Sequence, residues 1–190
     1  MDEKGKSKLL VIGGSAGSLS MVLHILPLLR AEMYLSVIIV FHRKQATEDT
    51  LVDLLAGRTT YRVKEAEDKD ELLPGVVYVA PPEYHVLVEK DRSLSLDISE
   101  KVNYSRPSID VTFESASDAY GESLICLLLS GANADGVRGL WVAKQAGAFI
   151  VVQDPASAEF PMMPQEAVDK VPVDMLLHEN NLSTLMNFFF

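Results

Sequence analysis

The feature that most constrains this chain is an apolar run that ends on a glycine-rich turn. Residues 8–12 read Lys-Leu-Leu-Val-Ile, which is typical of a short buried strand, and residues 13–17 read Gly-Gly-Ser-Ala-Gly. Apolar residues then recur at helical spacing from Leu19 to Leu29. Because glycines let the backbone turn sharply, this order predicts a strand, a tight turn and a helix, with Ser15 at the break.

Three interpretations of Ser15 follow from the turn alone. A serine between a strand and a helix N-terminus has the placement of a nucleophile elbow, and the helix dipole and free amides can stabilise an oxyanion. A glycine-rich turn of this kind can also hold a phosphate, although the G-x-G-x-x-G fingerprint requires a glycine where Ser15 stands. In the third interpretation Ser15 is a helix N-cap.

Length and patterning predict one domain over residues 1–190, with 48% hydrophobic residues available for its core. Residues 9–12, 35–41, 124–129 and 148–153 are apolar without alternation, as parallel strands buried on both faces are. The predicted fold is α/β, a doubly wound three-layer α/β/α domain with a mainly parallel sheet. The short alternating stretches 85–88 and 94–98 predict an antiparallel hairpin at a sheet edge. A further strand is predicted at 76–79, and helices at 18–29, 48–55, 109–120, 136–145, 166–170 and 182–189.

Charge and composition exclude several classes of partner. The net charge of −10 and the absence of a long Lys/Arg cluster argue against nucleic acid. The single Cys126 lies in an apolar run, so no internal disulfide is possible and a reducing compartment fits. No apolar run reaches the ~20 residues that span a bilayer, so we expect no membrane insertion and a cytoplasmic location. The histidines and carboxylates show no metal-ligand spacing, and no metal is expected.

Polar side chains follow three of the predicted buried strands. Ser15 follows the first, His42 the second, and Asp135 lies in the loop after Leu129. Because ligands collect beyond the carboxyl ends of the strands of such a sheet, the three should meet at one edge. A histidine that takes the serine proton and a carboxylate that orients the imidazole form a hydrolytic triad, although each residue alone is as consistent with a cap or a turn. We interpret the other histidines, at positions 24, 85 and 178, as structural or exposed.

Several sequence blocks follow one another in a fixed order along the chain. They are Ile12-Gly13-Gly14-Ser15-Ala16-Gly17, Val63-Lys64-Glu65-Ala66, residues 73–81 (Leu-Pro-Gly-Val-Val-Tyr-Val-Ala-Pro), Arg106-Pro107-Ser108-Ile109-Asp110 and Ser130-Gly131-Ala132-Asn133-Ala134-Asp135-Gly136. With these blocks the chain resembles the catalytic domain of the chemotaxis protein-glutamate methylesterase family, CheB. The resemblance runs from about residue 9 to near the C-terminus.

The resemblance places nucleophile, base and acid on Ser15, His42 and Asp135. It implies hydrolysis of γ-glutamyl methyl esters on the cytoplasmic helices of chemoreceptors, or on a similar methylated protein, and deamidation of glutamine there, with no cofactor. The backbone amides of Ala16 and Ala132 are the oxyanion-hole candidates, because both adjoin ends of the triad.

Departures from the family pattern concern the rim of the site and its regulation. Where the family reads T-G-M-G-x-D-G, this chain has Ala132 for the methionine and Asn133 for the second glycine. After the base, the usual Met-Pro is replaced by Arg43-Lys44, a candidate basic lip for an acidic receptor surface. Asn133 is a further rim candidate. The chain begins near the first strand, so we expect a stand-alone catalytic domain that is not gated by a receiver domain of its own; a separate response regulator is a candidate partner.

Two alternatives stay open at the level of sequence. One is a non-catalytic receptor-binding or regulatory module of the same fold that has lost its substrate pocket at Ala132 and Asn133. The other is an NADP-type nucleotide-binding domain, with residues 13–17 on phosphate and Arg43-Lys44 on the 2′-phosphate.

Overall fold

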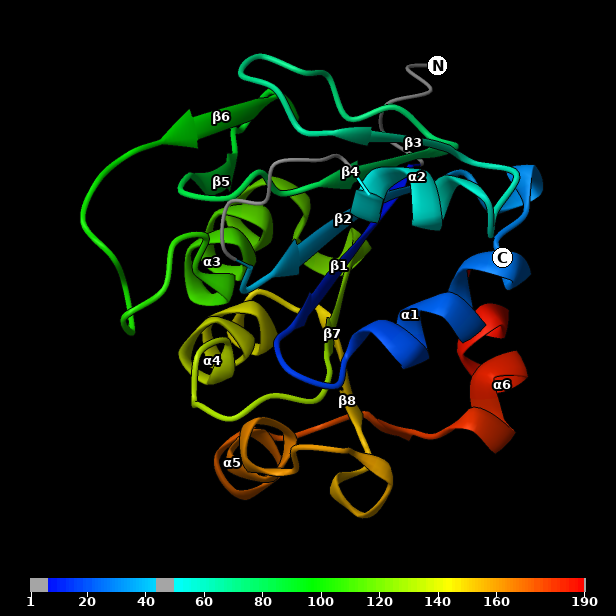
Figure 1. Cartoon of the computed structure of the whole chain (residues 1–190), viewed down its shortest axis with the longest axis vertical. Helices are drawn as coiled ribbons and strands as arrows, with labels where there is room; N and C mark the ends of the chain where they lie inside the picture. The colour runs from blue at the N-terminus through cyan, green and yellow to red at the C-terminus, as the bar shows by residue number, and fades with distance from the viewer. Residues whose placement is uncertain (1–6, 44–49, 190) are drawn as a thin grey trace.

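The computed structural model describes residues 7–43 and 50–189, and within them the chain forms one parallel sheet between two layers of helices (Figure 1). The sheet has seven strands in the order β3-β4-β2-β1-β7-β8-β9, and every neighbouring pair is parallel. β1 is central, with β2 on one side and β7 on the other. The strands are β1 (Lys8–Gly14), β2 (Leu35–Phe41), β3 (Arg62–Glu65), β4 (Val76–Val79), β7 (Leu124–Leu128), β8 (Phe149–Gln153) and β9 (Met175–Leu177).

Alternate residues of the strands supply two separate cores. Leu10 and Ile12 of β1 pack with apolar side chains of three helices on one face, while Leu9 and Val11 pack with three other helices on the other face. The first layer comprises α1 (Leu19–Ile25), α2 (Thr50–Ala56) and α6 (Leu182–Met186); the second comprises α3 (Ile109–Tyr120), α4 (Val137–Gln145) and α5 (Met162–Lys170). This arrangement explains why β1, β2, β7 and β8 lack polar alternation.

The predicted fold class is confirmed, with differences at its margins. The hairpin forms from β5 (His85–Val88) and β6 (Leu94–Asp97), but as a sheet of its own and not as an extension of the large sheet. The hairpin packs instead on the core beside α3, where Val86 and Val88 are buried. It cannot pair with β4, because β4 is already paired with β3 on one side and β2 on the other. The edge strands β3 and β9 were not predicted, because β3 is polar and β9 has three residues. None of the described helices is long and apolar enough to cross a membrane.

Candidate active site

The carboxyl ends of β1, β2 and β7 lie next to one another in the middle of the sheet. The direction in which strands are added changes here, because the chain builds the β2 side of β1 first and the β7 side afterwards. The backbone N–H of Ser15 donates to Ser130 O at 2.9 Å, which ties the turn after β1 to the loop after β7. The N–H of His42 donates to Gly14 O at 3.3 Å, which holds the residue after β2 against the end of β1. The structure therefore brings Ser15, His42 and the Asp135 loop together at one rim.

Glycine at position 13 permits the closest approach in this region. A Cβ there would lie 2.3 Å from Cγ2 of Ile109, the first residue of α3. A larger residue at position 13 would force the Ile109 side chain, or the N-terminus of α3 that carries it, to shift. The glycine therefore serves the placement of α3, whose first amides turn out to bind Asp135.

The Asp135 carboxylate is fully buried and accepts hydrogen bonds from several segments of the chain. Oδ2 binds His42 Nε2 at 2.7 Å and the Ile109 N–H at 2.7 Å. Oδ1 binds Asn103 Nδ2 at 2.9 Å, Ser108 Oγ at 2.8 Å and the Asp110 N–H at 3.2 Å. The carboxylate thus caps α3 while it orients the imidazole.

The charge of this group is stabilised by its donors. Burial alone would raise the pKa of Asp135, but hydrogen bonds from His42, the Ile109 amide and Asn103 outweigh burial and hold its pKa below the ordinary 3.8. Its neighbour Asp110 behaves in the opposite way, because burial and the Asp135 charge raise the pKa of Asp110 against the opposing bond from the Gly139 amide. Asp135 is therefore the acid that stays ionised beside the imidazole.

Asn103 and Ser108 are neighbours of the candidate site that residue types alone did not reveal. Neither carries a charge, neither directly follows a buried strand, and both contact Asp135 through their side chains. The available signal was the helix start at Ser108-Ile109-Asp110, since the amides of a helix N-terminus need an acceptor. Nothing in the sequence indicated that the acceptor is an aspartate 25 to 27 residues further on.

The second ring nitrogen of His42 faces the loop residue Asn133. Because Nε2 carries the proton shared with Asp135, Nδ1 is the nitrogen with a free lone pair. Asn133 Nδ2 lies 3.4 Å from Nδ1, and Asn133 Oδ1 accepts the Asp135 N–H at 3.0 Å. Within the described residues, Ser15 Oγ makes no hydrogen bond to His42. In this state the amide of Asn133, and not the serine, approaches the lone pair.

The two predicted oxyanion donors are placed in the loops that flank Ser15. In the part of the chain that the structure describes, the backbone N–H groups of Ala16 and Ala132 donate no hydrogen bond, so both amides are available to a ligand. Ala132 also lines a shallow apolar pocket of about 330 Å³ with Phe160, Pro161, Met162 and Gln165. Ala132 itself is exposed.

Of the two residues predicted to form a basic lip, Arg43 and Lys44, the structure describes Arg43. Arg43 Nη2 binds Glu65 Oε2 at 2.8 Å and the Ala80 carbonyl at 3.3 Å, and its side chain is 20% exposed. The guanidinium is therefore directed toward β3 and the end of β4. Lys44 lies outside the described residues.

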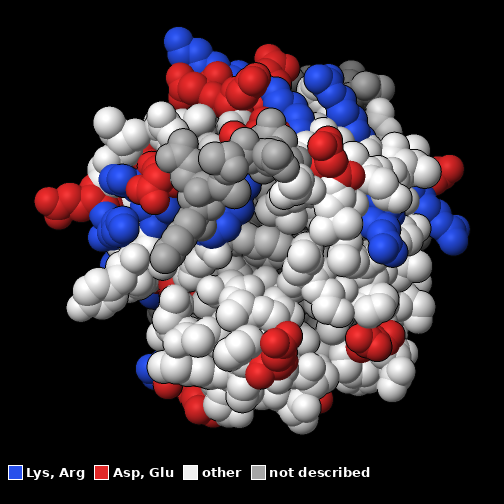
Figure 2. Space-filling model, viewed as in Figure 1, with Lys and Arg blue, Asp and Glu red and all other residues white. Residues whose placement is uncertain are grey.

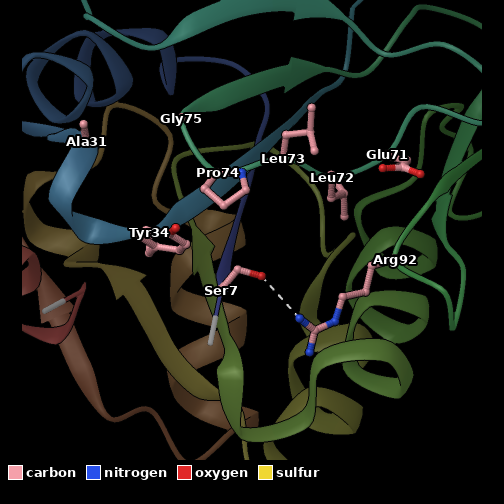
Figure 3. A pocket seen from close by; sticks show the side chains of 9 residues that line it. All are labelled: Ser7, Ala31, Tyr34, Glu71, Leu72, Leu73, Pro74, Gly75 and Arg92. Atoms are coloured by element: carbon pink, nitrogen blue, oxygen red, sulfur yellow. Dashed lines mark hydrogen bonds between the residues drawn. The ribbon is translucent and has the colours of Figure 1, made fainter. Parts of the chain in front are cut away.

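A separate pocket of about 470 Å³ lies near the opposite ends of the strands (Figure 3). It is lined by Tyr34, Ser7 and Arg92 together with residues 71–75, and Arg92 Nη1 binds Ser7 Oγ at 3.2 Å. Ser7 precedes β1, whereas Ser15 follows it, so the length of that strand separates the pocket from the rim. Ser15, His42 and Asp135 do not line this pocket.

Comparison with known proteins gives the family of the chain. Residues 10–186 match the CheB methylesterase family. The chain belongs to that family. A CheB methylesterase catalytic domain from Thermotoga maritima has the same fold, with a TM-score of 0.90, 28% identity, and coverage of 96% of this chain and 99% of that one.

Two relatives place the chain further within the family. A Leptospira interrogans relative is 43% identical over 93% of this chain and 91% of its own length. A Carboxydothermus hydrogenoformans protein named protein-glutamate methylesterase/protein-glutamine glutaminase 1 is 34% identical over 87% of this chain, but this chain spans only 50% of that relative. The comparisons confirm the family, the fold class and the methylesterase type of function that the sequence predicts, and they give no support to the nucleotide-binding alternative.

Proposed function

We propose that this CheB-family chain hydrolyses γ-glutamyl methyl esters, and deamidates glutamine, with Ser15 as nucleophile, His42 as base and Asp135 as the carboxylate that orients the base. The observation that carries the proposal is the 2.7 Å bond between His42 Nε2 and Asp135, at the edge of the sheet where Ser15 follows β1. That bond fixes the tautomer in which Nδ1 receives the proton.

The proposed reaction proceeds through an ester of Ser15. Ser15 Oγ attacks the side-chain carbonyl carbon, His42 Nδ1 takes the hydroxyl proton, and the oxyanion is bound by the amides of Ala16 and Ala132. The tetrahedral intermediate collapses, methanol leaves with the proton from His42, and a glutamyl ester of Ser15 remains. Water then attacks this ester by the same relay and releases the glutamate carboxylate and free serine. With glutamine the leaving group is ammonia.

The Asn133 contact determines what must move before attack. Ser15 Oγ reaches Nδ1 only if the Asn133 amide gives up its 3.4 Å contact, which is long enough to be weak. Catalytic hydrogen bonds are often long or absent without substrate and form in the complex. Bound substrate would therefore bring serine and imidazole together, with the anchored Asp135 unchanged.

The proposed substrates are methylated cytoplasmic helices of chemoreceptors, which would place the protein in the cytoplasm, with a separate response regulator as a candidate regulator. On the face shown in Figure 2, charged side chains gather at the upper rim and are sparser below it. The two core clusters, which share one sheet, support residues 1–190 as a single catalytic domain.

Methanol release from a methylated receptor fragment tests the assignment. We expect Ser15→Ala to reduce turnover by about 10³-fold or more while its thermal unfolding stays like that of the wild type. Ser20→Ala, at an exposed serine in α1, is the matched control and should retain full activity. Equal methanol release by wild type and Ser15→Ala would overturn the catalytic role of Ser15. Binding of the fragment without methanol release by the wild type would favour the non-catalytic module.

A further inference from the structure

The loop between β6 and α3 displays a fully exposed aromatic side chain. Val102 and Ser105 exchange two backbone hydrogen bonds, of 3.1 and 2.9 Å, so Asn103 and Tyr104 form a two-residue turn between them. Both turn residues have positive φ, 52° and 62°. That backbone favours glycine, asparagine or aspartate, yet the second position holds Tyr104, whose exposed fraction is 99%. Packing against the described residues therefore does not account for the ring.

The loop that carries Tyr104 is held from within by side-chain bonds at its two ends. Arg106 Nη1 donates to the carbonyls of Ile98 and Ser99, at 3.0 and 2.9 Å, and Nη2 pairs with Glu83 at 3.0 Å. The loop extends from the body of the molecule beside α3 (Figure 1).

The buried ring of His85 adds a second set of bonds to the same loop. Nε2 binds the Glu100 carbonyl at 2.9 Å, and Nδ1 accepts the Ser108 N–H at 3.1 Å. The backbone around Tyr104 is thus fixed before any partner arrives, which lowers the entropy lost on binding.

Asn103 connects the turn to the proposed active site. Its Nδ2 donates to Asp135 Oδ1 at 2.9 Å and to Asp110 Oδ2 at 2.7 Å. Asp135 in turn holds His42 at 2.7 Å. Tyr104 is therefore the next residue after one whose side chain binds the carboxylate that orients the base, and its ring is presented to solvent.

We infer that Tyr104 is a docking residue for the protein substrate and packs on the α-helix that carries the glutamyl ester. The inference rests on the proposed function and names the part of the enzyme that recognises the helix beyond the reacting side chain. Residues three, four and seven positions from the ester lie on the same face of a helix as the ester, where a projecting ring can contact them. A tyrosine suits this role because it offers a large amphipathic contact with few rotatable bonds.

Two substrates separate docking from chemistry. One is a methylated receptor fragment long enough to form the helix, and the other is a short peptide with a single glutamate γ-methyl ester. For Tyr104→Ala we expect KM for the fragment to rise about tenfold with kcat retained, and kinetics on the peptide like those of the wild type. Tyr104→Phe keeps the ring and should restore the low KM.

Tyr34→Ala is the matched control. Tyr34 also has a positive φ, 50°, and is 45% exposed, but it lines the pocket near the opposite ends of the strands. The Tyr34→Ala protein should show wild-type KM and kcat on both substrates. A KM for the fragment that Tyr104→Ala does not change would overturn the inference, and so would equal losses on fragment and peptide, because those indicate a distorted site.

Binding measured without turnover keeps this test independent of the proposed function. In the Ser15→Ala background, the fragment should bind about tenfold more weakly when Tyr104 is also replaced by alanine. A wild type that releases methanol from neither substrate overturns the proposed activity. The difference in affinity between the two Ser15→Ala proteins would still show whether the ring contacts the helix, and equal affinities would overturn the inference.

Discussion

Replacement of Asp135 by asparagine tests the central contact of the site, because the side chain keeps its shape and loses one acceptor. The asparagine oxygen can take the place of Oδ1, where it accepts from Asn103 and Ser108. Its NH₂ group then takes the place of Oδ2 and faces the N–H of Ile109 and Nε2 of His42. The NH₂ group and the Ile109 N–H are both donors, so no hydrogen bond forms between them. To accept a bond from the NH₂ group, the imidazole must move its proton from Nε2 to Nδ1, which is the nitrogen required as the base.

The magnitudes follow from the bonds lost. Two hydrogen bonds to a charged acceptor, worth about 1.5–3 kcal/mol each, are removed. Part of that loss is offset, because a neutral amide costs less to bury than a charge. The change also removes the Asp135 charge that, together with burial, raises the pKa of Asp110. We expect a net destabilisation of about 2 kcal/mol, equivalent to about 4–8 °C in Tm for a chain of this length. The wrong tautomer should lower kcat by about 10³- to 10⁴-fold.

Methanol release and thermal unfolding, measured on the same preparations, check both magnitudes. Asp118→Asn, at an exposed aspartate on α3, is the control and should match the wild type in each assay. A folded Asp135→Asn protein with kcat within tenfold of the wild type would refute the tautomer argument. Unfolding at the wild-type temperature would refute the account of Asp135 as the cap of α3.

Three further predictions follow from the buried groups. Burial raises the pKa of Asp110 above 3.8, so the stability that its protonation supplies is present at low pH and lost as pH rises. In urea unfolding, the free energy of unfolding of the wild type should therefore increase relative to that of Asp110→Asn as pH falls from 7 toward 4. A difference between the two proteins that does not change with pH would contradict this. Asn133→Asp keeps the acceptor for the Asp135 amide but turns a carboxylate toward His42 Nδ1. Because the carboxylate favours a protonated imidazole, kcat/KM should fall about tenfold or more at neutral pH, and the low-pH limb of its pH profile should move to higher pH. An unchanged pH profile would count against the assignment of Nδ1 as the base nitrogen. Burial raises the pKa of the Cys126 thiol well above its ordinary value, so a thiol reagent should label it only after unfolding, and rapid labelling of native protein would disprove its burial.

The sequence predicts the central strands because burial on both faces leaves a composition that is hard to mistake. Residues 9–12 and 35–41 are continuous apolar runs, and the structure pairs them in the middle of the sheet. Edge strands lack this signal: β3 is Arg-Val-Lys-Glu with partly exposed side chains. The start of α5 at Met162 was missed because Pro164 interrupts the pattern, although a proline is tolerated in the first turn of a helix.

The candidate site was predictable only where a residue type and a strand end coincide. Ser15 and His42 directly follow strands, and Asp135 follows one at a short distance, so topology alone places them at one rim. The role of Asn133 depends on which ring nitrogen faces the loop, and that choice is set by the bond from His42 Nε2 to Asp135. Asn103 reaches the carboxylate from a left-handed turn, and no periodicity in the sequence predicts such a turn.

The position of β7 between β1 and β8 has a consequence for how the protein matures during synthesis. Ser15 and His42 leave the ribosome long before residues 124–135 are made, so for much of that time the growing chain holds a serine and an imidazole without their acidic partner. β1 meanwhile keeps one open edge, the one that β7 fills in the finished sheet. Fragments that stop short of β7 should thus be inert toward esters and prone to associate through that edge, and hydrolytic competence would arise only when the middle of the sheet closes.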